Sequence, residues 1–186
     1  MSFEHQPFQI FTKPVSDLCN LHCSYCYYQT EKQGNKKART ILNDENLLET
    51  YIRQHIEATT GDTVFFSWHG GEPTLAGIDF YRKAVRLQKK YLPAGKKLLN
   101  GIQTNGTLID KEWCSFLKLE NFIAGVSIDG PEMLHDQFRI NQSKNGSFHE
   151  ANRGFKLLQK YGIPVEILCV VSSANENFPA EVYSFF

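Results

Sequence analysis

Three cysteines lie within eight residues near the start of the chain, in the stretch DLCNLHCSYC. Cys19, Cys23 and Cys26 follow the spacing C-x3-C-x2-C. Thiolates are strong ligands for zinc and for the irons of an iron–sulfur cluster. Only Cys114 and Cys169 bring the total to five, an odd number. An odd and clustered set argues against a disulfide framework and indicates metal binding or catalysis in a reducing compartment.

Two kinds of metal centre suit three clustered thiolates. A structural zinc site needs four ligands, and His22 is the candidate for the fourth, although it directly precedes Cys23 and is awkwardly placed for tetrahedral ligation. A four-iron cluster also usually takes four cysteines. If three cysteines hold such a cluster, one iron remains open to a small molecule. Binding of that molecule would explain why the motif has no fourth cysteine.

A second candidate site is the stretch GGEP, which follows a strand-like segment. Without side chains, Gly70 and Gly71 would let a ligand approach the backbone closely, and their carbonyl groups could accept hydrogen bonds from an ammonium group. Pro73 favours an extended backbone at Glu72. A plain Gly-Gly turn is the alternative interpretation, and it would be preferred if the cysteines were absent.

These motifs need a scaffold, and strand-like and helix-like segments alternate along the chain. β-Branched and aromatic residues predict strands at 8–15, 63–69, 97–105, 123–129 and 165–173. Helical patterns occupy 43–61, 78–95, 110–119 and 147–162, and a last helix starts near Pro179. The expected N-caps are Asn43, Asp110 and Ser147, the last in a capping box with Glu150. This alternation predicts an α/β fold with a parallel sheet and right-handed crossovers, either open or curled into a barrel.

Alternation within the strands indicates which face of the sheet carries chemistry. Gly125, Ser127 and Asp129 share one face of their strand, and Gln103 and Asn105 share one face of the preceding strand. A sheet covered on both sides would be apolar on both faces. We therefore expect a polar cavity at the carboxyl ends of the strands, where ligands bind in such folds. Gln103, Asn105 and Asp129 could contact a ligand, or could equally be turn or network residues.

The remaining cysteines and most histidines are expected to be structural. Cys114 lies in a helical pattern and Cys169 in an apolar strand, where free cysteine behaves as a small hydrophobic residue. His69, which precedes the glycine pair, could line a cofactor pocket. Four more histidines are expected at the surface or in caps: His5, His55, His135 and His149.

Composition narrows the classes of partner and compartment. The chain has 186 residues, of which 41% are hydrophobic, enough for one domain with a hydrophobic core. Twenty basic residues balance twenty acidic ones, so no net charge attracts nucleic acid or an anionic membrane. We see neither a secretory signal nor an apolar run long enough to span a membrane. These features predict a cytoplasmic protein.

Together the motifs resemble the radical S-adenosylmethionine superfamily. The aromatic residue Tyr25 precedes the last cysteine, and GGEP resembles the methionine-binding segment of that superfamily. Over nearly the whole chain, the stretches CNLHCSYCYY, WHGGEPTLAG, IQTNGTLID and VSIDGPEMLHDQFR resemble the anaerobic sulfatase-maturating enzymes. Those enzymes oxidise a serine or cysteine of a sulfatase to formylglycine.

The resemblance implies a site and its partners. A [4Fe-4S] cluster would be held by Cys19, Cys23 and Cys26, and S-adenosyl-L-methionine would bind at the fourth iron. The implied contacts of that cofactor are Tyr25 near the adenine, the segment Gly70, Gly71, Glu72 and Pro73 at the methionine end, and Ser127 and Arg139 at the carboxylate and ribose. Arginine suits a bidentate grip on a carboxylate, although a surface charge is the alternative for Arg139. The implied partners are a sulfatase or other peptide and an electron donor such as flavodoxin or ferredoxin.

The resemblance also implies an incomplete fold. We expect residues 1–186 to be one radical SAM domain, a partial (β/α)6 barrel of about five β/α units, without the cysteine-rich domain that carries auxiliary clusters in the family. The acidic residue that deprotonates the substrate would lie beyond Phe186, so no catalytic base is assigned. The alternatives are another peptide-modifying radical enzyme, which forms thioether or carbon–carbon crosslinks, and a non-catalytic zinc- or cluster-binding module.

Overall fold

A computed structural model describes residues 8–30 and 44–186, and its centre is one parallel sheet of five strands. The strands lie in their order along the chain, each paired in parallel with the one before it. They are β1 (Phe11–Thr12), β2 (Thr63–Trp68), β3 (Lys97–Thr104), β4 (Phe122–Ser127) and β5 (Val165–Leu168). The predicted α/β fold is therefore confirmed.

Two strands are shorter than the sequence predicted. After β1, Pro14 has no backbone N–H to give to the sheet, and the Ser16 N–H donates to the Lys13 carbonyl to form a turn. After β5, the Val170 N–H donates to a side chain, Oδ1 of Asp129, instead of to a neighbouring strand. A local proline and turn thus end β1, whereas a side chain 41 residues away ends β5.

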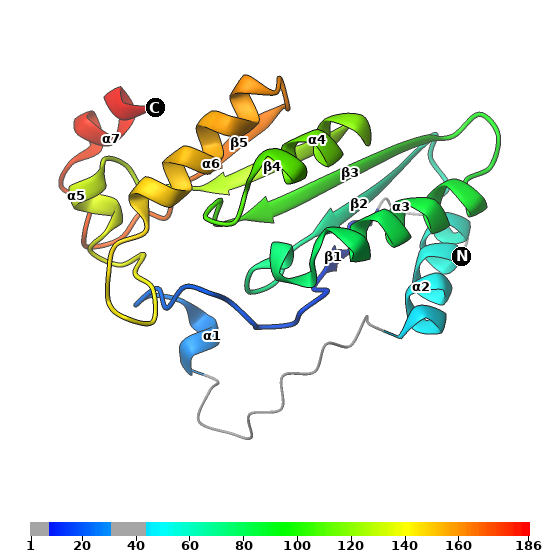
Figure 1. Cartoon of the computed structure of the whole chain (residues 1–186), viewed down its shortest axis with the longest axis horizontal. Helices are drawn as coiled ribbons and strands as arrows, with labels where there is room; N and C mark the ends of the chain where they lie inside the picture. Colours follow the sequence, from blue (N-terminus) through cyan, green and yellow to red (C-terminus); the bar gives the residue numbers. More distant parts are fainter. Residues whose placement is uncertain (1–7, 31–43) are drawn as a thin grey trace, which may run out of the picture.

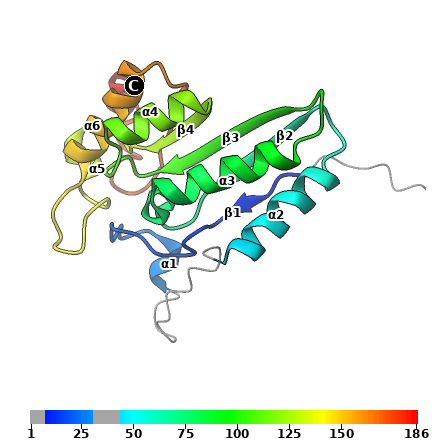
Figure 2. The same cartoon turned by 45° about the vertical axis from the view of Figure 1, so that its right-hand side comes forward.

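Four long helices cover one face of the sheet: α2 (Glu45–Ala58), α3 (Ile78–Tyr91), α4 (Lys111–Leu119) and α6 (Phe148–Lys160). Shorter helical turns are α1 (Tyr27–Thr30), η3 (Pro73–Ala76), α5 (Glu132–His135) and α7 (Pro179–Phe185). Figures 1 and 2 show the long helices on the same side of the sheet. None of the helices within 8–30 and 44–186 is long and apolar enough to cross a membrane.

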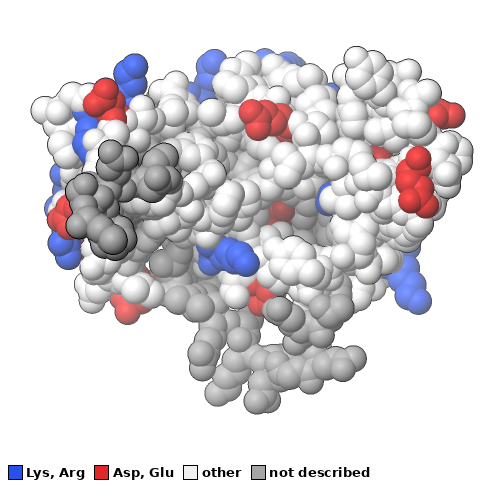
Figure 3. Space-filling model, turned by 180° about the vertical axis from the view of Figure 1, so that it is seen from behind, with Lys and Arg blue, Asp and Glu red and all other residues white. Residues whose placement is uncertain are grey.

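The core lies between these helices and the sheet. Phe66, Trp68, Ile102 and Val126 point to the helices and are almost completely buried. Full burial of such a side chain stabilises the fold by about 1.5–3 kcal/mol. On the opposite face, Gln103 and Ser127 are only partly buried. Figure 3 shows the molecule from behind, hollowed near its centre, with both acidic and basic side chains visible at the hollow.

The N-caps of the helices match those predicted from the sequence only in part. Asp110 caps α4, because its Oδ1 accepts a hydrogen bond of 2.9 Å from the Trp113 N–H. Asn43, the predicted cap of α2, lies outside the described residues. In the structure Asp44 caps that helix and accepts from the Asn46 N–H at 2.9 Å.

The capping box predicted for α6 is wrong. Ser147 stands at the N-cap, but its side chain makes no capping bond. Asp136 from the preceding loop does this instead, since its Oδ1 accepts from the N–H groups of Ser147 (2.8 Å) and Phe148 (2.9 Å). The Ser147 hydroxyl is then free to donate to the Arg139 carbonyl at 2.7 Å.

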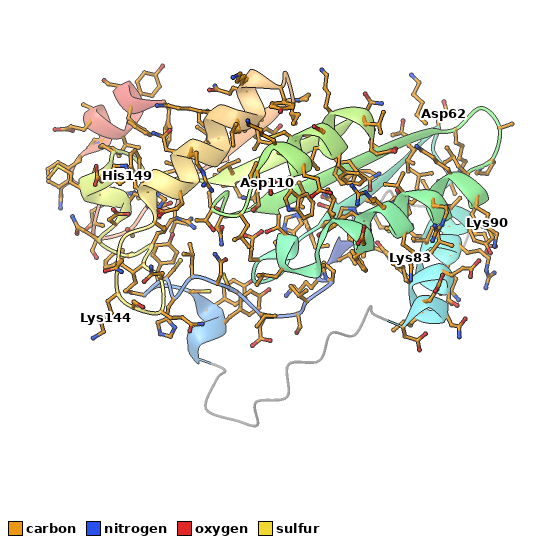
Figure 4. All side chains as sticks on the ribbon, viewed as in Figure 1. Asp62, Lys83, Lys90, Asp110, Lys144 and His149 are labelled. Carbon is orange, nitrogen blue, oxygen red and sulfur yellow. The ribbon has the colours of Figure 1, made fainter. Side chains whose placement is uncertain are left out.

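Charged side chains join the outer helices at the surface. In Figure 4, Lys83 and Lys90 of α3 extend toward α2, where Lys83 pairs with Glu45 (3.1 Å) and Lys90 with Glu49 (2.7 Å). Exposed pairs of this kind contribute little to stability, because solvent screens the two charges. They favour the docking of α3 on α2 without determining the fold.

Candidate cofactor site

The three clustered cysteines share one loop, between β1 and α1 at the carboxyl end of the sheet. Cys23 is buried, whereas Cys19 and Cys26 are partly exposed, and none of the three forms a disulfide. Burial raises the pKa of the Cys23 thiol to about 11; the Arg139 charge opposes that rise, and negative charge on Cys19 or Cys26 adds to it. The three thiols share this loop of eight residues. A metal that binds them would favour the thiolate form that burial disfavours.

A single metal ion has no ready ligand set in the structure. Within residues 8–30 and 44–186, no group of three or more His, Cys, Asp or Glu side chains is arranged to hold one ion. A four-iron cube places each thiolate on a separate iron, so its ligands are farther apart than those of one tetrahedral ion. Three neighbouring thiols on one loop are the donor set that a cluster needs.

The glycines of GGEP contact the cysteine loop directly. The Gly71 N–H donates to the Ser16 carbonyl at 2.9 Å, and the Glu72 N–H donates to the Leu18 carbonyl at 2.8 Å. A Cβ on Gly71 would lie 2.2 Å from the Leu18 oxygen, and Gly70 adopts a φ of 122°. The space that the glycines leave is thus taken by the backbone just before Cys19. The two sequence motifs form one structural unit.

Glu72 anchors this unit through a fully buried carboxylate. Its Oε1 accepts from the Thr74 hydroxyl (2.6 Å), the Thr74 N–H (3.1 Å) and the Thr104 hydroxyl (2.7 Å), and its Oε2 accepts from the Asn105 N–H (2.7 Å). Burial raises the pKa of Glu72, and these hydrogen bonds oppose the rise. The carboxylate joins the end of β2 to the end of β3. We call this arrangement the Glu72 anchor.

A second buried carboxylate, Asp129, lies at the end of β4 and holds three partners. Arg139 donates to it twice, from Nε to Oδ2 at 2.8 Å and from Nη2 to Oδ1 at 3.2 Å. The Tyr25 hydroxyl donates to Oδ2 at 2.6 Å, and the Val170 N–H donates to Oδ1 at 2.9 Å. We call this arrangement the Asp129 anchor.

Arg139 is not the surface charge that the sequence left as an alternative. Only 7% of the residue is exposed. Burial acts to lower the pKa of its guanidinium, but the charge and hydrogen bond of Asp129, with negative charge on Tyr25 and Cys23, together raise it. The Tyr25 ring lies beside the pair, with Arg139 Cζ 5.5 Å from its centroid and the Phe138 ring edge-on at 5.9 Å. Burial, followed by the bond to Asp129, raises the pKa of the Tyr25 hydroxyl.

The segment that carries Arg139 also pairs with the cysteine loop through its backbone. The His22 N–H donates to the Ile140 carbonyl at 2.7 Å, and the Ser24 N–H donates to the Phe138 carbonyl at 2.9 Å. The residues around Cys23 are thus held as a short ladder against residues 138–141. No sequence signal marked this contact, because the two segments lie more than a hundred residues apart.

Ser127 faces the hollow side of the sheet together with Gln103. The Gln103 Nε2 donates to the Ser127 hydroxyl at 3.1 Å. Gly125 leaves room for this side chain, since a Cβ there would lie 2.0 Å from the Gln103 Oε1. The predicted polar face therefore exists, and its members bond to one another.

Two histidines expected at the surface or in caps are buried instead. His135 is completely buried beside Asp129: its Nδ1 accepts from the Asp129 N–H at 3.3 Å, and its Nε2 lies 3.1 Å from the Ser147 hydroxyl. That hydroxyl already donates to a carbonyl, so Nε2 carries the proton. Burial lowers the pKa of His135 to about 4, so the ring is neutral. His55 is 5% exposed, with Nε2 at 3.0 Å from the Phe65 carbonyl oxygen.

A parallel β/α sheet with a three-cysteine loop locked to a glycine segment at its carboxyl end is the architecture of radical enzymes that use S-adenosylmethionine. The family model of the radical SAM superfamily matches residues 14–176, and the chain belongs to this superfamily. Its sheet corresponds to a partial radical SAM barrel.

Within this superfamily, the chain is similar in sequence to anaerobic sulfatase-maturating enzymes. The chain is 41% identical over 181 residues to a serine-type anaerobic sulfatase-maturating enzyme of Bacteroides thetaiotaomicron, covering 97% of this chain and 44% of that protein. It is 38% identical over 181 residues to a cysteine-type anaerobic sulfatase-maturating enzyme of Clostridium perfringens, covering 97% of this chain and 48% of that protein. The chain thus spans about half the length of these relatives.

Solved structures agree with the sequence comparison. Native anSMEcpe with bound AdoMet superimposes with a TM-score of 0.86 at 37% identity, over 94% of this chain and 47% of that one. Native anSMEcpe with bound AdoMet and Kp18Cys peptide superimposes with a TM-score of 0.85, also at 37% identity, over 94% of this chain and 46% of that one.

Proposed function

We propose that the chain holds a [4Fe-4S] cluster through Cys19, Cys23 and Cys26 and binds S-adenosyl-L-methionine beside it. The observation that carries this proposal is the loop itself, which brings three thiols together. Its backbone carbonyls at Ser16 and Leu18 accept from the GGEP segment, and its Tyr25 hydroxyl donates to Asp129. Membership of the radical SAM superfamily and the likeness to an AdoMet-bound structure support it.

When bound, the cluster would supply the electron that cleaves the sulfonium to methionine and a 5′-deoxyadenosyl radical. The chain's part is to bind, orient and protect the cofactor. Tyr25 would contact the adenine from its fixed place beside Arg139. Gly70, Gly71 and Pro73 would border the methionine end, where Glu72 acts through the backbone because its carboxylate is committed to the fold.

Ser127 and Arg139 would contact the carboxylate and ribose end. Asp129 occupies Nε and Nη2 of Arg139, and within the described residues the third nitrogen, Nη1, makes no hydrogen bond. A cofactor carboxylate would therefore meet Nη1 while the guanidinium stays paired with Asp129. Ser127 would share its hydroxyl between Gln103 and the cofactor.

For the whole reaction we propose oxidation of a peptidyl serine or cysteine to formylglycine. The similarity to both serine-type and cysteine-type maturating enzymes supports this substrate class. We propose that residues 1–186 form the radical SAM domain of such an enzyme in the cytoplasm, that a flavodoxin or ferredoxin supplies electrons, and that the catalytic base lies beyond Phe186.

Anaerobic reconstitution tests this function. The protein is loaded with iron and sulfide, reduced, and given S-adenosylmethionine; we expect 5′-deoxyadenosine, and we expect none after Cys23→Ser. Cys169→Ser is the matched control, since Cys169 lies outside the loop. A protein that carries a cluster but never cleaves the cofactor would exclude the proposal.

The substrate is tested separately with sulfatase peptides that carry serine or cysteine at the target position. Formylglycine is recognised by its reaction with hydrazines and, for serine, by the loss of two hydrogens. A peptide that acquires a thioether or carbon–carbon crosslink instead would assign the chain to another class of peptide-modifying radical enzyme.

A further inference from the structure

The three cysteines of the loop do not have equivalent surroundings. The sulfur of Cys19 accepts hydrogen bonds from the Leu21 N–H at 3.4 Å and from the Asn105 side-chain amide at 3.8 Å. Among the residues that the structure describes, no N–H or O–H group donates to the sulfur of Cys23 or Cys26. One thiol of the set is therefore singled out by polar donors.

Asn105 is held firmly in the place from which it reaches Cys19. It is 8% exposed, and its backbone N–H is bound by the buried Glu72 carboxylate at 2.7 Å. Its Oδ1 accepts from the Thr107 N–H (3.0 Å) and hydroxyl (2.8 Å), which leaves the Nδ2 hydrogens directed at Cys19 and at the Asn20 Oδ1 (2.9 Å). The orientation of the amide is thus determined by its neighbours, because only Nδ2 can donate.

Asn20 reinforces the same orientation from the loop side. Its Nδ2 donates to the Thr107 hydroxyl at 2.9 Å, while its Oδ1 receives the Asn105 amide. The end of β3 and the cysteine loop are therefore joined by a closed set of neutral hydrogen bonds around Cys19. A side chain held in this way donates to the sulfur without further loss of conformational freedom.

We propose that Asn105 is a positioning residue for the cluster: its amide stabilises the Cys19 thiolate and raises the reduction potential of the cluster that this thiolate holds. The physical reason is that reduction adds negative charge to the cluster and its sulfurs, and an N–H donor favours the more negative state. The inference rests on the proposed function, since it requires a cluster at Cys19.

The chain contains a natural control for this inference. Asn175 is 4% exposed, and its Nδ2 lies 3.7 Å from the sulfur of Cys169, which is outside the three-cysteine loop. Its Oδ1 accepts a backbone bond from the Ser172 N–H at 2.8 Å, as the Asn105 Oδ1 does from Thr107. Alanine at either site removes an N–H···S contact, from Cys19 in one case and from Cys169 in the other. At Asn175 it also removes the amide bonds to the carbonyls of Asp129 (3.1 Å) and Val170 (2.9 Å).

The test is a redox titration of the reconstituted protein, followed by the electron paramagnetic resonance signal of the reduced cluster. We expect the midpoint potential to shift to more negative values in Asn105→Ala and further in Asn105→Asp, which also adds negative charge. Asn175→Ala should leave the potential where it is in the unsubstituted protein. Asn105→Asp keeps the oxygen that accepts from Thr107, so it remains informative if Asn105→Ala does not fold.

Each outcome decides the matter. Unchanged potentials in both Asn105 variants, or an equal shift in Asn175→Ala, would overturn the inference. Loss of iron and sulfide from folded Asn105 variants, with retention in Asn175→Ala, would support the positioning role. If the unsubstituted protein takes up no cluster, the proposed function fails, and this result is distinct from a failure at Asn105.

Discussion

Two residues with buried carboxylates, Glu72 and Asp129, contact the cysteine loop, and the hydrogen-bonding partners of their carboxylates differ. In the Glu72 anchor, neutral donors alone surround a carboxylate that is completely buried. In the Asp129 anchor, a carboxylate pairs with a buried cation, Arg139. Glu72 reaches the loop through its backbone N–H, which donates to the Leu18 carbonyl, whereas the Asp129 carboxylate accepts from Tyr25, between Cys23 and Cys26.

The difference predicts which side of the loop is more sensitive to substitution. Neutralising one member of a buried ion pair leaves the other charge buried without its partner, which is more destabilising than the loss of an ordinary hydrogen bond. Neutralising Glu72 removes a charge that has no buried cationic partner in the described structure, so only its hydrogen bonds are affected. We therefore expect substitutions in the Asp129 anchor to lower the free energy of unfolding more than substitutions in the Glu72 anchor.

The largest expected effect is that of Asp129→Asn. This change leaves the Arg139 charge buried, and we expect the free energy of unfolding to fall by about 3–5 kcal/mol. Denaturant unfolding of the cluster-free protein measures it. Asp79→Asn is the matched control, because it breaks an exposed Asp–Arg pair of the same length, 2.8 Å. Its effect should be much smaller, because solvent screens that pair. Equal effects would remove the distinction between the anchors.

The next effect is a dependence of stability on pH that comes from His135, whose Nδ1 accepts from the Asp129 backbone N–H. Burial lowers the pKa of His135 to about 4, below the ordinary value of 6.5. Between these two pH values the histidine is therefore protonated in the unfolded chain and neutral in the folded one. Stability is then fully present above about pH 6.5 and is lost as the pH falls toward 4, by on the order of 3 kcal/mol.

The measurement is the free energy of unfolding across this pH range, compared with His135→Gln. The difference between the two proteins in the free energy of unfolding at pH 8 measures the part of the histidine's contribution that does not depend on pH. Its curve should lack the decline between pH 6.5 and 4 that the histidine causes. A parallel decline in both proteins would show that another group is responsible.

A smaller effect is expected for Glu72→Gln. The amide can keep the acceptor for Thr74 and Thr104, but its NH2 group then faces the Asn105 N–H, so that one buried donor loses its partner. We expect a loss of about 2 kcal/mol, less than for Asp129→Asn. A larger loss than at Asp129 would reverse the comparison between the two anchors. The same denaturant experiment decides it.

The smallest of these effects is that of Tyr25→Phe. The change removes the 2.6 Å hydrogen bond to Asp129 and keeps the ring against Phe138 and Arg139. We expect about 1.5 kcal/mol, as for a hydrogen bond to a charged group. Tyr183→Phe, at a side chain that is 85% exposed, is the control and should change stability by less than about 0.5 kcal/mol. If both variants behave alike, Tyr25 does not link the loop to Asp129.

The sequence predicted what depends on neighbours in the chain. The strand preceding GGEP and the helix opened by Asp110 follow from local periodicity and a local cap, and both were confirmed. The three cysteines share a loop because they lie within eight residues of one another. For the same reason the resemblance of short motifs was enough to identify the superfamily.

What the sequence missed depends on contacts between distant segments. Tyr25 and Asp129 are 104 positions apart, and no periodicity connects them. Asp136 replaced the predicted capping box of α6 because a loop folds back over the helix start. His135 looked like a surface residue, since its two hydrogen-bond partners come from the end of β4 and the start of α6.

The pairing of residues 21–24 with 138–141 has a consequence for biosynthesis. The strands are laid down in their order in the sheet, so each can join its predecessor as it leaves the ribosome. The cysteine loop emerges near the beginning, yet its backbone partners are made more than a hundred residues later. The loop around Cys23 therefore gains its backbone partners only after residues 138–141 have been made, when four of the five strands are already complete.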